Sequence, residues 1–209
     1  MTKIFLSYRR EDSADVVGRI FDRLERHFGR ESLFWDVDAI RYGEDFRRRV
    51  GEALDQTGVL LAIIGDRWLD AADRAHPAGG RRLDDPNDYV GIEISSALKR
   101  GITVMPVLVG GAQMPRSADL PAHLAELSYR NAAEVRSGRD FSFHVNRLIT
   151  AINDLLALPQ ELGSLQQRLS TRVAISTTPA ARRLASCMGM SNRETSSCVP
   201  MARRSSWTL

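Results

Sequence analysis

Cysteine is scarce in this 209-residue sequence. The two cysteines, Cys187 and Cys198, both lie near the C-terminus, so no disulfide bond can cross-link the body of the chain. They could pair with each other, but we expect two free thiols in a loose tail. Apolar runs are short as well, and none approaches the about 18 residues of a transmembrane helix. The N-terminus lacks the apolar segment of a signal peptide, and we therefore expect a cytoplasmic protein.

Motifs of several common enzyme classes are also missing. The only lysines are Lys3 and Lys99, and neither follows the glycine pattern of a phosphate-binding loop, which excludes a Walker-type nucleotide hydrolase. The sequence contains no G-x-G-x-x-G after its first apolar run and no G-x-S-x-G, so the usual dinucleotide-binding fold and the hydrolases with a nucleophile elbow are excluded. The four histidines show no metal-ligand spacing, so we expect no metal site.

The C-terminal segment differs in kind from the rest. Residues 159–209 hold seven arginines against Glu161 and Glu194, so most of the net charge of +3 lies there and the remainder is slightly acidic. Charge therefore gives little reason to expect nucleic acid as a partner of the folded part. Binding of anionic lipid or nucleic acid by the tail alone is a separate, weaker hypothesis.

This change in composition divides the chain into a domain, residues 1–157, and a tail, residues 158–209. Three leucines at the start of the tail have helical spacing, and they are Leu162, Leu165 and Leu169. Beyond Ser170 the sequence is rich in Ser, Thr and Arg without periodicity. We expect a weak helix followed by disordered chain.

Short apolar runs alternate with helical patterns along the domain. A continuous apolar run bounded by polar residues is typical of a strand buried on both faces. The predicted strands are Ile4–Ser7, Leu33–Trp35, Val59–Gly65, Ile102–Val109 and Ser128–Arg130. The predicted helices cover residues 12–28, 46–58, 67–72, 88–100, 121–127 and 141–156. This order predicts a flavodoxin-like α/β fold of three layers, with a five-stranded parallel sheet ordered 2-1-3-4-5.

Local signals place several boundaries. Asp12 or Ser13 is a good cap for the first helix, and Asp88 is a good cap for the helix that follows it. Pro106 cannot donate a ladder hydrogen bond, so we expect it at a bulge or where pairing on one side of its strand has ended. The glycines and prolines of residues 77–86 predict a mobile loop.

Four segments in this order resemble the TIR (Toll/interleukin-1 receptor) domain of bacterial proteins, over about residues 1–156. They are Phe5-Leu6-Ser7-Tyr8-Arg9-Arg10, Phe34-Trp35-Asp36-Val37 with Gly43 in the charged loop that follows, Leu60-Leu61-Ala62-Ile63-Ile64, and Asp88-Tyr89-Val90-Gly91-Ile92-Glu93-Ile94. TIR domains act either as scaffolds that assemble with other TIR domains or as enzymes that cleave NAD. The enzymes carry a catalytic glutamate in the context Asp-Trp-x-x-x-Glu. Here the matching residues are Asp88, Tyr89 and Glu93, and tyrosine replaces tryptophan.

A single carboxylate suits this reaction. Cleavage of the nicotinamide–ribose bond expels a neutral pyridine, so the leaving group needs no general acid, unlike the leaving group of an ordinary glycoside. Glu93 could then stabilise the positive charge that develops on the ribose. The rival interpretation is a solvated helix glutamate, which is the commoner fate of a glutamate one turn into a helix.

The resemblance also implies substrate-binding residues, each with a structural rival. Tyr8 and Arg9 follow the first strand and could hold a ribose or a phosphate, or they could end the strand and pair with Glu11 or Asp12. Phe34 would form an aromatic wall against the nicotinamide, although it could be a core residue, and Tyr89 would keep an aromatic ring at the site. The loop from Asp36 to Phe46, with Gly43 at its turn, would close over substrate or mediate assembly.

Two functions follow from the resemblance. The first is an NAD+ hydrolase, acting in signal transduction or antiviral defence and activated by self-association. It would release nicotinamide and ADP-ribose or a cyclic isomer, with NAD+ as its substrate and no cofactor. The alternative is a non-catalytic module that binds other TIR domains, either as a signalling scaffold or as an effector that interferes with a host's signalling.

Overall fold

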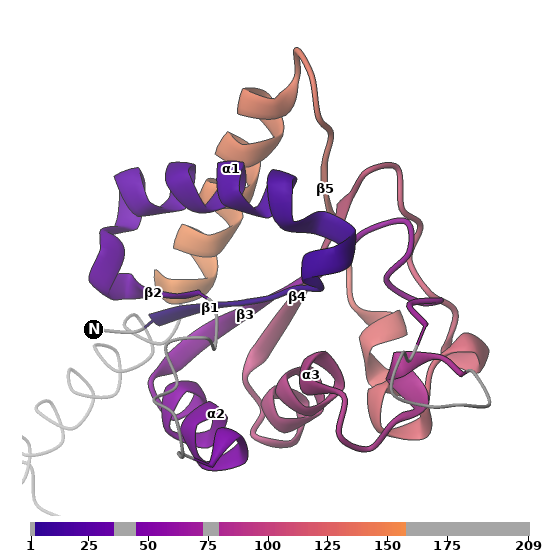
Figure 1. Ribbon diagram of the computed structural model, residues 1–209. Helices are drawn as coiled ribbons and strands as arrows, with labels where there is room; N and C mark the ends of the chain where they lie inside the picture. Colours follow the sequence, from indigo (N-terminus) through magenta and orange to yellow (C-terminus); the bar gives the residue numbers. More distant parts are fainter. Residues whose placement is uncertain (1–2, 36–44, 73–79, 158–209) are drawn as a thin grey trace, which may run out of the picture. The chain divides into compact units, whose positions relative to one another are not determined.

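The computed structural model describes residues 3–35, 45–72 and 80–157, and its centre is a five-stranded parallel sheet (Figure 1). The strands are β1 (Lys3–Ser7), β2 (Leu33–Trp35), β3 (Thr57–Ile64), β4 (Thr103–Val109) and β5 (Ala133–Val135). Their order is β2-β1-β3-β4-β5, which confirms the predicted fold class and sheet order. The predicted tail, residues 158–209, lies outside the described residues.

The central strands run together in register. Ile4 of β1 lies opposite Leu33 of β2 on one side and Val59 of β3 on the other. Pro106 of β4 pairs with β3, whereas pairing with β5 begins only at the next residue. The strand therefore has one unpaired side at Pro106, as predicted for a residue without an amide hydrogen.

Helices cover both faces of the sheet. The elements are α1 (Arg10–Phe28), α2 (Phe46–Leu54), α3 (Tyr89–Lys99), the 3-10 segment η5 (Ala122–Tyr129) and a final helix over 141–157. On one face α1 and the final helix pack together over the strands (Figure 1). On the other face lie α2, α3 and η5. Among the described helices none is long and apolar enough to cross a membrane.

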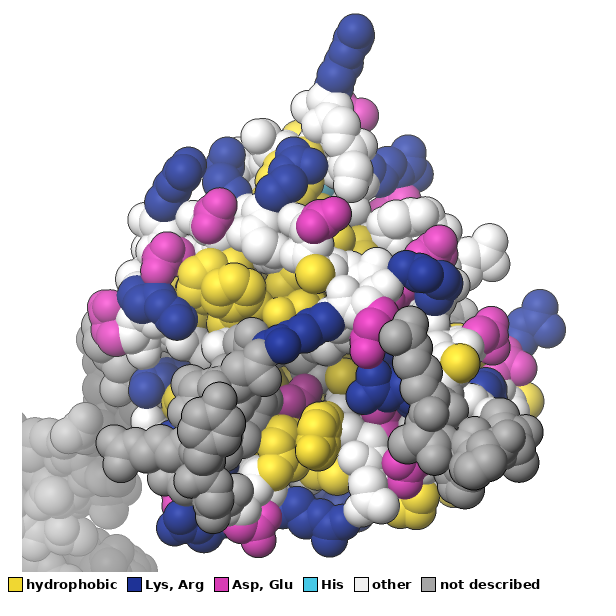
Figure 2. Space-filling view, viewed as in Figure 1, with side chains coloured by type: hydrophobic (Ala, Val, Ile, Leu, Met, Phe, Trp, Pro, Cys, Tyr) yellow, Lys and Arg dark blue, Asp and Glu magenta, His cyan; other side chains and the backbone are white. Residues whose placement is uncertain are grey.

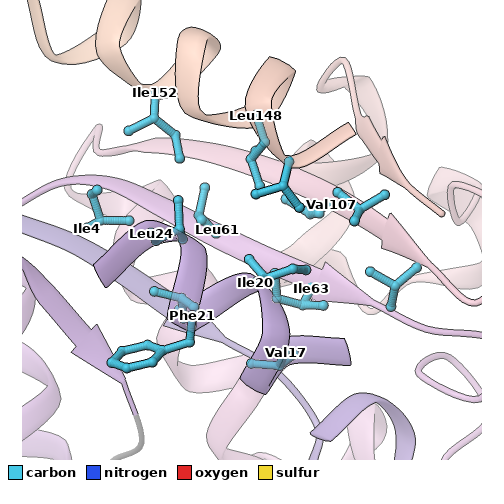
Figure 3. Close-up of a cluster of buried hydrophobic side chains, with 14 of the residues drawn as sticks. Ile4, Val17, Ile20, Phe21, Leu24, Leu61, Ile63, Val107, Leu148 and Ile152 are labelled. Carbon is cyan, nitrogen blue, oxygen red and sulfur yellow. The ribbon is translucent and has the colours of Figure 1, made fainter. Parts of the chain in front are cut away.

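The α1 face shows why the periodicity of the sequence folds this way. Residues three and four apart on a helix share one side, so α1 presents a single apolar stripe. Figure 3 shows this stripe, residues Val17, Ile20, Phe21 and Leu24, against side chains from β1, β3 and β4. Leu148 and Ile152 of the final helix complete the same cluster. The sheet is thus buried on both faces, as the continuous apolar runs predict.

The predicted cap of α1, Asp12 or Ser13, is wrong by three or four residues. The helix begins at Arg10, and its N-cap is Arg9, which provides no side-chain cap hydrogen bond. The Arg9 carbonyl accepts from the amides of both Asp12 and Ser13, at 3.1 and 3.0 Å, so those residues already belong to the first turn. The Arg9 side chain is held elsewhere by tertiary contacts.

Three further element predictions need correction. The second helix ends at Leu54, because β3 already begins at Thr57. Residues 66–70 form turns rather than a helix, with Trp68 fully buried beneath the α3 face. The fifth strand is Ala133–Val135, since the predicted Ser128–Arg130 lies at the end of η5.

The predicted loop over 77–86 is partly regular. Residues 77–79 lie outside the described part. Arg81 forms an antiparallel bridge with Ala72, and Arg82–Asp84 is a 3-10 turn whose Leu83 is 1% exposed. The buried Leu83 therefore anchors residues 80–86, which the glycine and proline content predicted to be a mobile loop.

Candidate functional site

Glu93 lies on α3 at the carboxyl end of β1, and its side chain is sheltered. The residue is only 5% exposed. The Ser7 hydroxyl, on the last residue of β1, donates a hydrogen bond to Glu93 Oε2 at 2.6 Å. A buried ionised carboxylate requires such partners, because burial without them favours the protonated form.

Asp88 caps α3, and a buried ion pair holds it in place. Asp88 Oδ2 accepts from the Gly91 amide at 3.0 Å, which confirms the predicted N-cap. The two terminal nitrogens of Arg9 donate to the two carboxylate oxygens of Asp88, each at 2.8 Å. Both side chains are 1% exposed. This bidentate geometry fixes the start of α3, and hence Glu93 one turn later, against the end of β1.

Arg9 is fully engaged in this arrangement. Its Nε donates to the Trp68 carbonyl at 3.1 Å, so the guanidinium bonds on both sides. The structural alternative for Arg9 was an ion pair with Glu11 or Asp12. Arg9 does form an ion pair, but its partner is Asp88. The contacts favour a structural role for Arg9 over contact with a phosphate.

A cleft of about 240 Å³ opens beside Glu93 at the strand ends. It brings together parts of the chain that are far apart in sequence. The lining residues are Leu6, Tyr8, Arg9, Arg10, Glu11, Phe46, Arg82, Tyr89, Val90 and Glu93. Figure 2 shows hydrophobic side chains gathered low on this face, over the region of α2 and α3, with charged side chains around them.

An aromatic pair forms one wall of the cleft. The rings of Phe46 and Tyr89 lie 4.1 Å apart between centroids, at an interplanar angle of 34°. Tyr89 is 56% exposed, so a ligand can reach its ring. Tyr89 was predicted as a site residue, whereas Phe46 was predicted only as the end of the charged loop and the start of a helix. Its position directly after the charged loop was the one available signal.

The other predicted substrate-binding residues are distributed differently. Tyr8 lines the cleft and also packs against the α1-side core. Phe34 packs 6.2 Å from the Phe5 ring, with Lys3 Nζ 4.4 Å from its own ring centroid. Among the described residues the cleft wall includes Phe46 and not Phe34, which favours the core interpretation of Phe34. Asp36 and Gly43 lie outside the described residues.

A second cavity of about 670 Å³ adjoins the first and shares Arg9, Glu11, Arg82 and Tyr89 with it. Its remaining walls are acidic overall, because Asp12, Asp66, Asp70, Asp85 and Asp88 lie there against Arg67, the single cation among the other described lining residues. Repulsion makes these walls a poor surface for a phosphate. Across the described part of the chain, no group of three His, Cys, Asp or Glu residues could hold a metal ion.

Asp12, which lines this second cavity, has a carboxyl with a raised pKa. Burial raises the pKa of its carboxyl above the ordinary value, and the neighbouring Asp66 carboxylate raises it further. The Arg67 amide donates to Asp12 Oδ1 at 2.9 Å and partly opposes this shift.

The arginine run of α2 lies at the surface. Arg48 and Arg49 form exposed ion pairs with Glu52, and Arg47 donates to the Asn87 side chain at 2.9 Å. The run therefore forms a solvated helix face.

The sheet order, the two helical layers and the cleft at the strand ends define an open α/β protein of the flavodoxin-like class. Residues 4–149 match the family described as the TIR domain, and the chain belongs to that family. Comparison with curated protein sequences gives no match.

Two solved structures illustrate the relationship. The TIR domains in the structure of the activated Roq1 resistosome directly recognizing the pathogen effector XopQ align with a TM-score of 0.53 and 13% identity, covering 73% of this chain and 99% of that chain. A metazoan TIR-STING receptor from C. gigas, in complex with 2',3'-cGAMP, aligns with a TM-score of 0.41 and 17% identity, covering 68% of this chain and 38% of that chain. At 13% identity, the similarity to the Roq1 TIR domains shows a shared fold only.

The Arg9–Asp88 pair predicts a large loss of stability on Arg9→Met. This change leaves a buried carboxylate without its main partner, and we expect a loss of about 3–5 kcal/mol in the free energy of unfolding, measured by urea denaturation. Adding Asp88→Asn should recover part of it. Arg136→Met, which removes an exposed ion pair with Glu134, is the matched control and should be nearly neutral. A small effect of Arg9→Met, equal to that of the control, contradicts the assignment.

The raised pKa of Asp12 predicts that Asp12→Asn stabilises the protein at neutral pH. Because the folded pKa lies above the unfolded one, the carboxyl stabilises the fold at low pH, and this contribution is lost as the pH rises through the folded pKa. The advantage of the asparagine variant should therefore shrink as the pH falls toward the ordinary value of 3.8. Denaturant midpoints of both proteins, measured from neutral pH down to about pH 3.8, give this difference in stability. Asp70→Asn, at an exposed aspartate, is the control. An advantage that grows on acidification contradicts the prediction.

Proposed function

We propose that this TIR domain is an NAD+ hydrolase that cleaves the nicotinamide–ribose bond, with Glu93 as its catalytic residue. The observation that carries the proposal is a sheltered carboxylate beside a cleft with an exposed aromatic wall. Glu93 is 5% exposed yet lines the cleft, next to Tyr89. A solvated helix glutamate, the rival interpretation, would be far more exposed.

The chemistry needs few groups. The bond from ribose C1′ to the pyridinium nitrogen breaks, and its electron pair neutralises the ring, so nicotinamide leaves without a proton. Positive charge develops on the ribose, and the Glu93 carboxylate stabilises it at close range. The oxygen of a water molecule then bonds to C1′ and releases one proton, which gives ADP-ribose. Attack by an adenine nitrogen instead gives a cyclic isomer.

The size of the cleft suggests which part of NAD+ it takes. Its volume of about 240 Å³ lies below the roughly 300–1,000 Å³ of typical small-molecule sites. It suits the nicotinamide and its ribose rather than the whole dinucleotide. The cationic pyridinium can lie against the Tyr89 ring, since cations are attracted to aromatic faces. The acidic walls of the adjoining cavity direct the diphosphate away from that side.

Self-association is the second element of the proposal. The Roq1 structure is described as an activated resistosome whose TIR domains align with this chain over 73% of its length. By analogy, neighbouring copies of this chain would enclose the part of NAD+ that extends beyond the small cleft.

The alternative function is a non-catalytic module that binds other TIR domains. One observation favours it, which is the exposure of Tyr89. Aromatic residues are enriched at protein interfaces, and a ring that is 56% exposed beside Phe46 is suited to contact with a partner. The two functions differ in whether the folded protein consumes NAD+.

Replacement of the carboxylate tests the catalytic role of Glu93. Glu93→Gln keeps the size of the side chain and removes its charge, and we expect NAD+ cleavage to fall by about 10²–10³-fold. Nicotinamide release from concentrated full-length protein measures the rate. Glu52→Gln changes an exposed glutamate on α2 and should leave the rate unchanged.

Two results would contradict this proposal in different ways. A folded wild type that leaves NAD+ intact, even when fused to an oligomerising helix, removes the enzyme function and favours the docking module. Equal rates for the wild type and Glu93→Gln keep the enzyme function and remove the site.

Self-association predicts that the specific activity depends on protein concentration. If a neighbouring copy completes the site, the rate per molecule should rise as the protein is concentrated and the assembly forms. Nicotinamide release and light scattering on the same samples should rise together. A specific activity that stays constant while the particle mass increases argues against this part of the proposal.

A further inference from the structure

We propose that Ser7 is the positioning residue of Glu93, and that its hydroxyl keeps the carboxylate ionised and correctly oriented. The inference rests on the proposed function of Glu93. Ser7 lies on β1, and it would act on the reaction only through its hydrogen bond to Glu93.

The contact joins two distant parts of the chain at one buried point. Ser7 ends β1, where it pairs with Ala62 of β3, so the central strands hold its backbone. Glu93 projects from α3, which is held at its start by the Asp88 cap. The Oγ–Oε2 distance of 2.6 Å lies in the range of short hydroxyl–carboxylate hydrogen bonds.

The hydrogen bond from Ser7 matters for the ionisation of Glu93 because both side chains are buried. Glu93 is 5% exposed and Ser7 is 1% exposed, so water contributes little to solvation of the carboxylate on this side. Burial disfavours the ionised form, whereas a hydrogen bond donated to that form favours it. The Ser7 hydroxyl therefore opposes the effect of burial. It also orients the carboxylate by holding Oε2 against the end of β1.

Ser7 is placed to act through Glu93 rather than on the substrate. Its neighbours Leu6 and Tyr8 line the cleft, whereas Ser7 itself is almost fully buried. Loss of its hydroxyl should therefore change the turnover rate and its pH dependence, and leave the affinity for NAD+ unchanged.

Other charged and titratable groups face the same cleft from the surrounding elements. They are Arg9 and Tyr8 after β1, Arg10 and Glu11 on α1, Arg82 on η3 and Tyr89 on α3. Removing one oxygen atom from Ser7 leaves all of them in place, so a matched pair of variants isolates its effect.

Ser7→Ala in the full-length protein is the test. The acid limb of the kcat profile should move up by about one pH unit, because the carboxylate loses a charged hydrogen bond. KM should stay unchanged. Ser7→Thr, which keeps the hydroxyl, should restore the wild-type profile. Ser95→Ala is the control, since it also removes a buried hydroxyl, one on α3 whose hydrogen bond goes to the Ile92 carbonyl and not to Glu93.

A second measurement follows Glu93 without NAD+. Carboxyl-carbon NMR of glutamate-labelled protein gives the titration of Glu93, identified as the signal lost in Glu93→Gln. Its midpoint should rise in Ser7→Ala and not in Ser95→Ala. This measurement also applies if the alanine variant is too unstable for long kinetic assays, because Ser7→Cys, a weaker donor of similar size, should shift the midpoint in the same direction.

The outcomes separate this inference from the proposed function. A shifted Glu93 titration in a protein that never cleaves NAD+ removes the enzyme function and keeps the Ser7–Glu93 interaction. A wild type that cleaves NAD+ through Glu93, with kinetics and titration identical in Ser7→Ala and Ser95→Ala, overturns the role of Ser7.

Discussion

The buried ion pair between Arg9 and Asp88 is the constraint on which the site depends. Taking two charges out of water is costly, and the cost is offset only when the geometry is good and the remaining polar groups are bonded. Here the pair is bidentate, Arg9 also bonds the Trp68 carbonyl, and Asp88 also caps α3 through the Gly91 amide. The end of β1 and the start of α3 are thereby held together.

That junction determines where the acidic side chain of α3 is presented. With Asp88 fixed as the cap, Glu93 follows one turn later and meets Ser7, the last residue of β1. In the same region the first residue of α2, Phe46, lies against the first residue of α3, Tyr89. The cleft therefore combines a partly sheltered carboxylate with an exposed aromatic wall. These are the two features that the proposed cleavage of a pyridinium–ribose bond requires.

Some features were predictable from sequence because they depend on local chemistry. The apolar run Val59–Ile64 has no polar residue that could face water, so a strand buried on both faces was the consistent interpretation. Asp88 before a helical pattern predicted a cap for the same local reason. The errors occurred where tertiary contacts outweigh local preference. Asp12 was a good cap by type, yet Arg9 occupies the cap position because Asp88 and Trp68 hold its side chain.

The class of fold and the order of most elements could be predicted from the sequence, since apolar periodicity and capping residues are local properties of the chain. Glu93 became a candidate only through the resemblance of its segment to TIR enzymes. Only the tertiary structure decided the partner of Arg9, the place of Phe46 in the cleft wall, the packing of Phe34 against Phe5 and the hydrogen bond from Ser7 to Glu93. These contacts join residues up to 86 positions apart. No local pattern records such pairs, because they exist only once the helices have packed against the strands.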